Sequence, residues 1–210
     1  MSMLEGNREC GIRHRFEVRH RDRAPNRHPA EMEQLIHWCQ VFDHEGLAPV
    51  EGGASAGNLS FRTSAGFVIT PTRSLLKSNL DWRAFVEVVR VDRRGFALHV
   101  LGEHAPSSDS FLHERLYALR PDVMAVFHGH DDLVLTHADA LAREFPIAVT
   151  GEARLFGTLD DAEDTAREMG SAPYCIRKGH GFVSVGRTLS AAGELAVTIH
   201  RRAVEISKQA

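Results

Sequence analysis

Two histidines separated by a single glycine, His128 and His130, are the residues of this chain best suited to metal chemistry. They follow a short apolar run, residues 123–127, which predicts a buried strand leading into the pair. On an extended segment, side chains two residues apart point to the same face, so both imidazoles can reach one ion. The spacing therefore predicts half of a histidine metal site, although an isolated pair is also compatible with two solvated histidines at a strand end.

A third histidine and a carboxylate complete a candidate ligand set. His180 lies downstream between two glycines, and Asp109 lies upstream at the end of a Pro-Ser-Ser-Asp segment. Three imidazoles and one carboxylate can form a catalytic Zn²⁺ site or a site for a related divalent metal. A metal held in this way polarises a carbonyl or hydroxyl oxygen of a substrate. The set predicts a metal-dependent lyase or isomerase.

Asp109 has two candidate roles in such a site. Ser107, Ser108 and the start of a predicted helix favour the ionised form of its carboxyl group, and a nearby divalent cation favours that form more strongly. The carboxylate can then be a metal ligand, or it can be the base that accepts a proton from the substrate. The alternative is an ordinary carboxylate at a helix N-terminus.

The elements that must position these residues alternate in type along the chain. Apolar periodicity and turn residues predict helices over 29–45, 108–120, 131–143, 159–169 and 189–208. They predict strands over 58–63, 67–70, 85–91, 96–101, 123–127, 145–149, 174–177 and 182–185. Early hairpins, followed by helices between the later strands, indicate a three-layer α/β/α sandwich around a mixed, mostly antiparallel sheet.

Length and composition limit the possible partners. The chain has 210 residues and a net charge of −3, which favours one domain and gives no reason to expect nucleic acid or an anionic membrane as a partner. The three cysteines are far apart, and no apolar run is long enough to span a bilayer, so a cytoplasmic protein is expected. Residues 1–28 carry seven arginines and little apolar periodicity. We expect them to form a polar extension that is flexible or packs on a neighbouring subunit, with residues 29–210 forming the domain.

Five motifs in order make residues 29–208 resemble the class II aldolase/adducin family. They are Gly57-Asn58-Leu59-Ser60, Ile69-Thr70-Pro71-Thr72, Pro106-Ser107-Ser108-Asp109 followed by His113 and Tyr117, His128-Gly129-His130, and Gly179-His180-Gly181 followed by Gly186, Leu189 and Ala192. The resemblance implies an α/β/α fold and a homotetramer with active sites at subunit interfaces. It also implies Zn²⁺, or Mn²⁺, Co²⁺ or Fe²⁺, bound by the residues that match His128, His130 and His180.

The resemblance also suggests roles for residues around the metal. Asp109 stands where the fuculose-phosphate aldolase branch has a glutamate ligand and where the ribulose-phosphate 4-epimerase branch has an aspartate. Further residues match the family's phosphate-binding positions: Asn58, Thr72, Ser107 and Ser108. Small residues around Gly57 let the backbone approach a ligand or another strand closely.

The chain departs from the aldolases after Thr72, where a glycine is replaced by Arg73. An arginine there can bind phosphate or carboxylate, or it can fill the pocket and shift the preferred substrate. The alternative is that Arg73 and Lys77 form a solvated basic turn. The family's two catalytic tyrosines have no counterpart, because Val149 falls near one position and the tail lacks the other. Glu152 or Tyr174 could replace these tyrosines as proton donors. The alternative is that both residues only support the fold.

These observations predict a metal-dependent aldolase-type lyase, with zinc as the expected metal. It would cleave or form a carbon–carbon bond in a small hydroxy-carbonyl or sugar-phosphate substrate. The reaction would pass through an enediolate, with Asp109 moving the proton. The same chemistry also serves a 4-epimerase, a dehydratase or a decarboxylase. A non-catalytic adducin-like binding protein is a further alternative, which the retained histidines disfavour.

Overall fold

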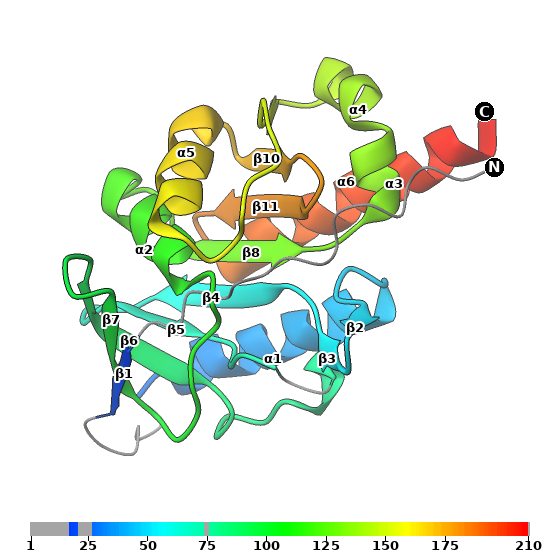
Figure 1. Ribbon diagram of the computed structural model, residues 1–210. Helices are drawn as coiled ribbons and strands as arrows, with labels where there is room; N and C mark the ends of the chain where they lie inside the picture. Colours follow the sequence, from blue (N-terminus) through cyan, green and yellow to red (C-terminus); the bar gives the residue numbers. More distant parts are fainter. Residues whose placement is uncertain (1–16, 21–26, 74–75, 210) are drawn as a thin grey trace.

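A nine-stranded sheet in the order β1-β7-β6-β5-β4-β8-β11-β10-β9 forms the centre of the molecule (Figure 1). The computed structural model describes residues 17–20, 27–73 and 76–209. The strands are β1 (Glu17–His20), β4 (Asn58–Arg62), β5 (Phe67–Ile69), β6 (Val86–Asp92), β7 (Ala97–Leu101), β8 (Ala125–Gly129), β9 (Ile147–Val149), β10 (Tyr174–Arg177) and β11 (Gly181–Gly186). The edge pairs β1–β7 and β9–β10 are parallel, and the other pairs of this sheet are antiparallel.

Helices cover both faces of the sheet (Figure 1). On one face, α1 (Pro29–His44) and α6 (Leu189–Gln209) contact each other and pack on β4, β8 and β11. On the other face, α2 (Ser110–Leu119) and α5 (Leu159–Met169) pack together and contact β6, β9 and β10. Alternation along the strands produces two cores, since Phe127 faces the first helix pair and Val126 the second. The predicted three-layer sandwich with a mostly antiparallel sheet is confirmed.

Shorter elements connect the layers. The hairpin of β2 (Val50–Glu51) and β3 (Ala54–Ser55) precedes β4, and a 3-10 turn, η1 (Lys77–Asn79), packs on α1. Two short helices, α3 (Asp132–Thr136) and α4 (Ala138–Glu144), follow β8. Among the described residues, none of the helices is both long enough and apolar enough to cross a bilayer.

Three local predictions differ from the structure. The helix expected over 131–143 is two helices that meet at His137, and the first is capped by Asp131, whose carboxylate accepts two backbone N–H bonds. The helix expected from Ser108 begins at Ser110, so Asp109 occupies the N-cap position. The strand expected over 123–127 is shifted to 125–129 and includes His128 itself.

Strand β1 was not predicted. It lies within residues 1–28, which the sequence analysis places outside the domain, yet it pairs in parallel with β7. Val18 packs on the core beneath α2 and α5, and the free edge of β7 supplies the backbone partners. Residues 1–16 and 21–26 lie outside the described part of the chain, so the expectation for them stays a prediction.

Candidate metal centre

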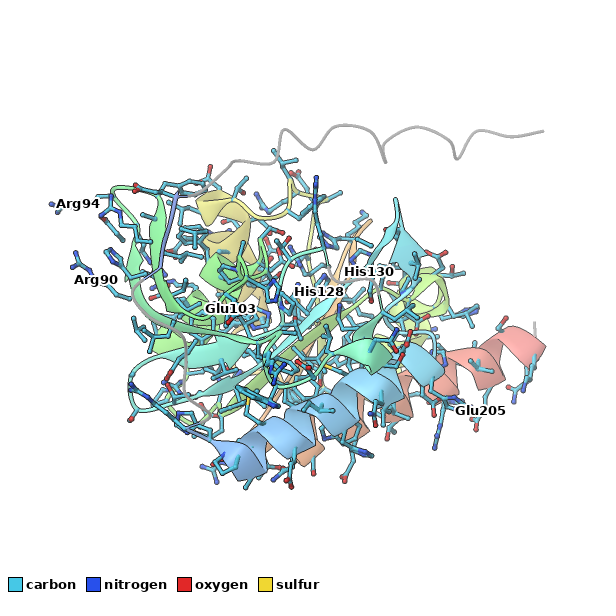
Figure 2. The ribbon with its side chains drawn as sticks, turned by 90° about the horizontal axis from the view of Figure 1, so that it is seen from below. Arg90, Arg94, Glu103, His128, His130 and Glu205 are labelled. Atoms are coloured by element: carbon cyan, nitrogen blue, oxygen red, sulfur yellow. The ribbon has the colours of Figure 1, made fainter. Side chains whose placement is uncertain are left out.

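Three histidines from two parts of the sheet converge. His128 is in the central strand β8, His130 follows that strand, and His180 lies in the turn between β10 and β11. Their ring centroids are 4.8 to 5.0 Å apart, and one ligand atom from each lies within 4.8 Å of the others. Figure 2 shows His128 and His130 close together, far from Glu205 near the end of α6. The structure thus brings together the three imidazoles that the sequence singles out.

Glycines allow the strands that bear the histidines to approach closely. A Cβ atom on Gly129 would lie 2.8 Å from the Leu47 carbonyl oxygen and would also collide with the Phe182 ring. Gly57 has a φ of +69°, and a Cβ there would lie 2.5 Å from the His128 carbonyl oxygen. The glycine of the first family motif therefore packs against the backbone of a candidate ligand.

The donor atoms of the cluster fit a divalent metal. His128 is 1% exposed in its side chain, and its Nδ1 donates to the Phe182 carbonyl at 2.7 Å, which leaves Nε2 as the acceptor. This Nε2 lies 3.1 Å from Nε2 of His180. Burial lowers the pKa of His128, His130 and His180, so the rings are neutral, the form in which an imidazole can bind a metal. Tetrahedral Zn²⁺ with Zn–N bonds of about 2.0–2.1 Å requires nitrogens about 3.3 Å apart.

A carboxylate that the sequence analysis missed lies beside His130. Nδ1 of His130 is 3.4 Å from Oε1 of Glu51, in the small β2–β3 hairpin. Carboxylates in this position orient a ligating imidazole and make it more basic. No sequence signal points to Glu51, because its position depends on a strand of only two residues, which is too short to show periodicity.

Asp109 lies at the side of the cluster. Its Oδ2 accepts from Asn58 Nδ2 at 3.1 Å and is 3.5 Å from His128 Nε2, while its Oδ1 is buried without a hydrogen-bond partner. Burial alone would raise the pKa of this carboxyl, but the positive charge of Arg177 holds it well below its usual range. The site therefore contains an ionised carboxylate with one unpaired oxygen.

Arg177 is a second residue that the sequence analysis missed. It ends β10 and is 3% exposed in its side chain, with Nη1 3.5 Å from Asp109 Oδ2 and Nη2 2.5 Å from Asp161 Oδ2. Asp161 is on α5, and burial raises its pKa against the opposing charge of Arg177. The sequence signal for Arg177 is a charged residue at the end of an apolar strand. This signal does not identify the partners of Arg177, which lie 16 and 68 residues away in the chain.

The candidate phosphate-binding residues lie on two adjoining segments. A bridge between Pro71 and Pro106 places Thr72 near Ser107, and Thr72 N donates to the Ala105 carbonyl. Ser107 is buried, and its Oγ accepts from Asp109 N. Ser108 is half-buried and faces Gly157, whereas Arg73 is exposed with a φ of +55°.

Lys77 differs from the expectation of a solvated basic turn. Its side chain is buried under the β2–β3 hairpin, where Nζ donates to Ser55 Oγ at 3.3 Å. Burial lowers its pKa to about 8. It is therefore part of the protein interior and does not join Arg73 in a surface cluster.

The substitute proton donors are also placed by the structure. Tyr174 is fully buried and stacks on Phe182 in the core on the opposite face of the sheet from Arg177, so it does not reach the cluster. Glu152 is exposed. Phe156, which the sequence analysis did not single out, meets the His180 ring edge-on at 5.0 Å and is 37% exposed. It gives the rim of the site an apolar surface.

Comparisons with known proteins place this site in a family. The sequence profile described as "Class II Aldolase and Adducin N-terminal domain" matches residues 33–205, a range that includes all the candidate site residues. This chain belongs to the class II aldolase and adducin family. The prediction made from the five motifs is thereby confirmed, and the three-histidine cluster lies within the matched region of this family member.

Individual relatives agree with that assignment. The chain is 33% identical over 161 residues to a 5-methylthioribulose-1-phosphate/5-deoxyribulose-1-phosphate aldolase of Rhodospirillum rubrum, covering 71% of this chain and 69% of the relative. It is 27% identical over 172 residues to an L-fuculose phosphate aldolase of Methanocaldococcus jannaschii, covering 76% and 86%. A sugar-phosphate aldolase from Thermotoga maritima shares the fold, with a TM-score of 0.71 at 16% identity over 86% and 94% of the chains.

Proposed function

We propose that this family member is a metal-dependent, aldolase-type lyase that cleaves or forms a carbon–carbon bond in a phosphorylated hydroxy-carbonyl substrate. One observation carries the proposal: three neutral imidazoles converge beside Asp109, a buried ionised carboxylate with an unpaired oxygen. Two relatives that bear the names of ketose-phosphate aldolases support the reaction class. The proposal includes a cytoplasmic homotetramer, as the resemblance to the family implies. Its sites would lie at subunit interfaces, where a neighbouring subunit could cover the exposed rim at His130 and Phe156.

His128, His130 and His180 would hold the metal, and we propose Zn²⁺, with Mn²⁺, Co²⁺ and Fe²⁺ as alternatives that also suit imidazole ligands. When bound, the metal supplies Lewis-acid polarisation of substrate oxygens and stabilises the negative charge that develops on them. The Phe182 carbonyl fixes the ring of His128, and Glu51 does the same for His130.

Asp109 moves the proton. Asn58 and Arg177 engage Oδ2, so we assign to Oδ1 the acceptance of a proton from the substrate, whose electron pair stays on the substrate, and the return of that proton to the product. The exclusion of water from this carboxylate strengthens its interaction with a nearby positive charge. In this role Asp109 lies next to His128 and acts beside the metal ligands. It does not need to bind the metal as a fourth ligand.

The phosphate group would lie at the junction of segments 70–73 and 105–109. Thr72, Ser107 and Ser108 offer hydroxyl groups, and α2 begins there with its N-terminal dipole. The exposed Arg73 can add a bidentate contact to a phosphate oxygen pair. Gly57 and Asn58 complete this side of the site through the backbone of His128 and the carboxylate of Asp109.

The first test is the metal content of the purified protein and of a His128→Ala/His130→Ala variant, with His44→Ala, an exposed histidine on α1, as the control. We expect about one divalent ion per chain in the wild type and the control, and none in the double variant. Synthesis from dihydroxyacetone phosphate and a panel of aldehydes then tests the reaction. Absence of metal after reconstitution with Zn²⁺, Mn²⁺, Co²⁺ and Fe²⁺ would exclude the proposal.

A 4-epimerase is the second candidate, because Asp109 is an aspartate, as in the epimerase branch of the family. The same assay separates the two functions. Release of a three-carbon phosphate identifies a lyase, and interconversion of two pentulose phosphates without release identifies an epimerase. Loss of water from the same substrates would identify a dehydratase.

A further inference from the structure

A buried line of three charged side chains runs from helix α5 to the histidine cluster. Asp161 and Arg177 form an ion pair, Nη2 to Oδ2, at 2.5 Å, and Arg177 Nη1 lies 3.5 Å from Asp109 Oδ2. None of the three residues is more than 4% exposed. The line therefore connects a helix on the outside of the sheet to the carboxylate beside His128.

The ion pair is not explained by the stability of the fold. Moving two charged side chains out of water costs more free energy than burying an apolar pair of similar size. Buried ion pairs therefore often add no net stability to the folded protein. Asp161 is not needed to cap α5 either, because Thr158 is the N-cap and accepts from the Asp161 backbone N–H. Besides Arg177, the partner of the Asp161 side chain is Thr165, one turn later on the same helix.

The geometry indicates what the pair does. The short contact of Nη2 with Asp161 anchors one end of the guanidinium group, and Nη1 of the same rigid group lies 3.5 Å from Asp109 Oδ2. Arg177 and Asn58 then both engage Oδ2, and this leaves Oδ1 unpaired. Without Arg177, only Asn58 would donate to this carboxylate, because Nε2 of His128 is an acceptor, and rotation about the terminal torsion of Asp109, which is soft, would exchange the two oxygens.

We propose that Arg177, anchored by Asp161, is a positioning residue that holds Oδ2 of Asp109 beside the histidine cluster and leaves Oδ1 unpaired. The inference rests on the proposed function for its catalytic consequence and on the contacts above for its structural content. Arg177 itself is buried and acts through Asp109, so it is not assigned a contact with the substrate.

The test uses a double variant, Asp161→Leu/Arg177→Leu, which removes one charge of each sign. The apolar pair avoids the desolvation of two ions, but it also leaves Asp109 without its cation. We therefore expect the variant to fold with a melting temperature about 10 °C below that of the wild type. With Co²⁺ alone as the probe metal, it should bind the ion, but its visible absorption spectrum should differ. The value of kcat should fall roughly 10- to 100-fold with little change in KM, because the carboxylate is misplaced by a fraction of a bond length or more.

Two further variants separate positioning from packing. Arg177→Lys keeps a cation and should therefore recover part of the lost kcat. The recovery should be incomplete, because a lysine cannot contact Asp161 and Asp109 through two rigidly linked nitrogens. Arg115→Gln/Glu163→Gln is the control, because it removes a half-exposed ion pair of 2.7 Å between α2 and α5, together with the contact of Glu163 with Arg93. It should leave the spectrum and kcat unchanged. A double Leu variant with wild-type kcat and spectrum would show that the pair is structural only. A raised KM with unchanged kcat would show that Arg177 binds substrate, and would also overturn the proposal.

A failure of the proposed function is distinguishable from a failure of this inference. If the wild type binds metal without turning over any substrate of the panel, the lyase proposal fails, and the crystal structure of the double Leu variant decides the inference. Asp109 should then have moved relative to His128 and Asn58. If Asp109 keeps both contacts, Arg177 does not position it, whatever reaction the protein catalyses.

Discussion

The Nε2 atoms of His128 and His180 lie 3.1 Å apart, although one residue belongs to the central strand β8 and the other to the turn after β10. Two lone pairs at this distance repel each other unless a proton or a cation lies between them, and burial disfavours the proton on either ring. The antiparallel pairing of β8 with β11 sets this distance, since it holds His128 opposite Val183, three residues after His180.

Metal removal should lower the stability of the protein. A metal that binds only the folded state adds about 2.7 kcal/mol at a free concentration about 100 times its Kd. We therefore expect a chelator to lower the melting temperature of the wild type, and Zn²⁺ to restore it. The His180→Ala variant should show no response to either reagent, whereas His44→Ala should respond like the wild type. A chelator-insensitive wild-type melting temperature would contradict metal binding by the cluster.

Replacing Gly129 with alanine should destabilise the fold. The added Cβ would lie 2.8 Å from the Leu47 carbonyl oxygen and against the Phe182 ring, so the strands must separate. The expected loss is about 1–3 kcal/mol in the free energy of unfolding, measured by urea titration. Gly151→Ala is the matched control, because nothing lies within 4 Å of its Cβ position. Equal effects from the two substitutions would show that the close approach at Gly129 carries no cost.

Glu51→Gln should weaken metal binding while leaving the fold intact. Glutamine keeps the size of the side chain but cannot supply the negative charge that orients His130 and raises its basicity. Loss of such a partner typically reduces metal affinity about 10–100-fold. Competition with a chromophoric chelator measures the effect, and Glu33→Gln, on the exposed side of α1, is the control. Unchanged affinity would mean that Glu51 does not support His130.

The contact between His200 and Asp131 should make stability depend on pH. Nδ1 of His200 donates to Asp131 Oδ2 at 2.7 Å, and this bond, aided by Glu45 and opposed by burial and by Arg201, raises the pKa of His200 above its ordinary value. A pKa that is higher in the folded state stabilises the fold below the unfolded pKa, and the gain is lost as pH rises through the folded pKa.

The corresponding measurement compares the wild type with His200→Gln at pH 6 and at pH 8.5. At pH 6 the free energy of unfolding should be larger for the wild type than for His200→Gln. The difference should be only about 0.5–1 kcal/mol, because the ion pair is partly exposed to solvent, and it should shrink at pH 8.5. Parallel curves for the two proteins would show that the pair carries no pH-dependent stability.

Some of this architecture follows from local sequence. Helix α5 has the predicted bounds because its ends carry clear signals, Thr158 as the N-cap and Gly170 after the last turn. The meeting of His128 with His130 follows from the alternation of side chains on an extended segment. Both inferences need only residues that lie close together in the chain.

Other features depend on contacts between distant segments. Strand β1 has the composition of a polar tail, and it is a strand because the edge of β7 is available to it. The pairing of Arg177 with Asp161 requires knowing that α5 packs against β10. Glu51 reaches His130 only through a two-residue strand. Neither propensity nor periodicity contains this information, since tertiary contacts decide each case.

The location of the three histidines also has a consequence for the dynamics of the site. His128 lies on a strand that is hydrogen-bonded on both sides, to β4 and to β11, whereas His180 lies in a turn with a glycine at a φ of +71° beside it. Backbone amides of β8 should therefore be among the slowest to exchange with deuterium, and those of residues 178–180 among the faster ones. A metal bound here would have one ligand on a rigid strand and another on a more mobile turn. His180 would therefore be the first ligand to dissociate from the metal.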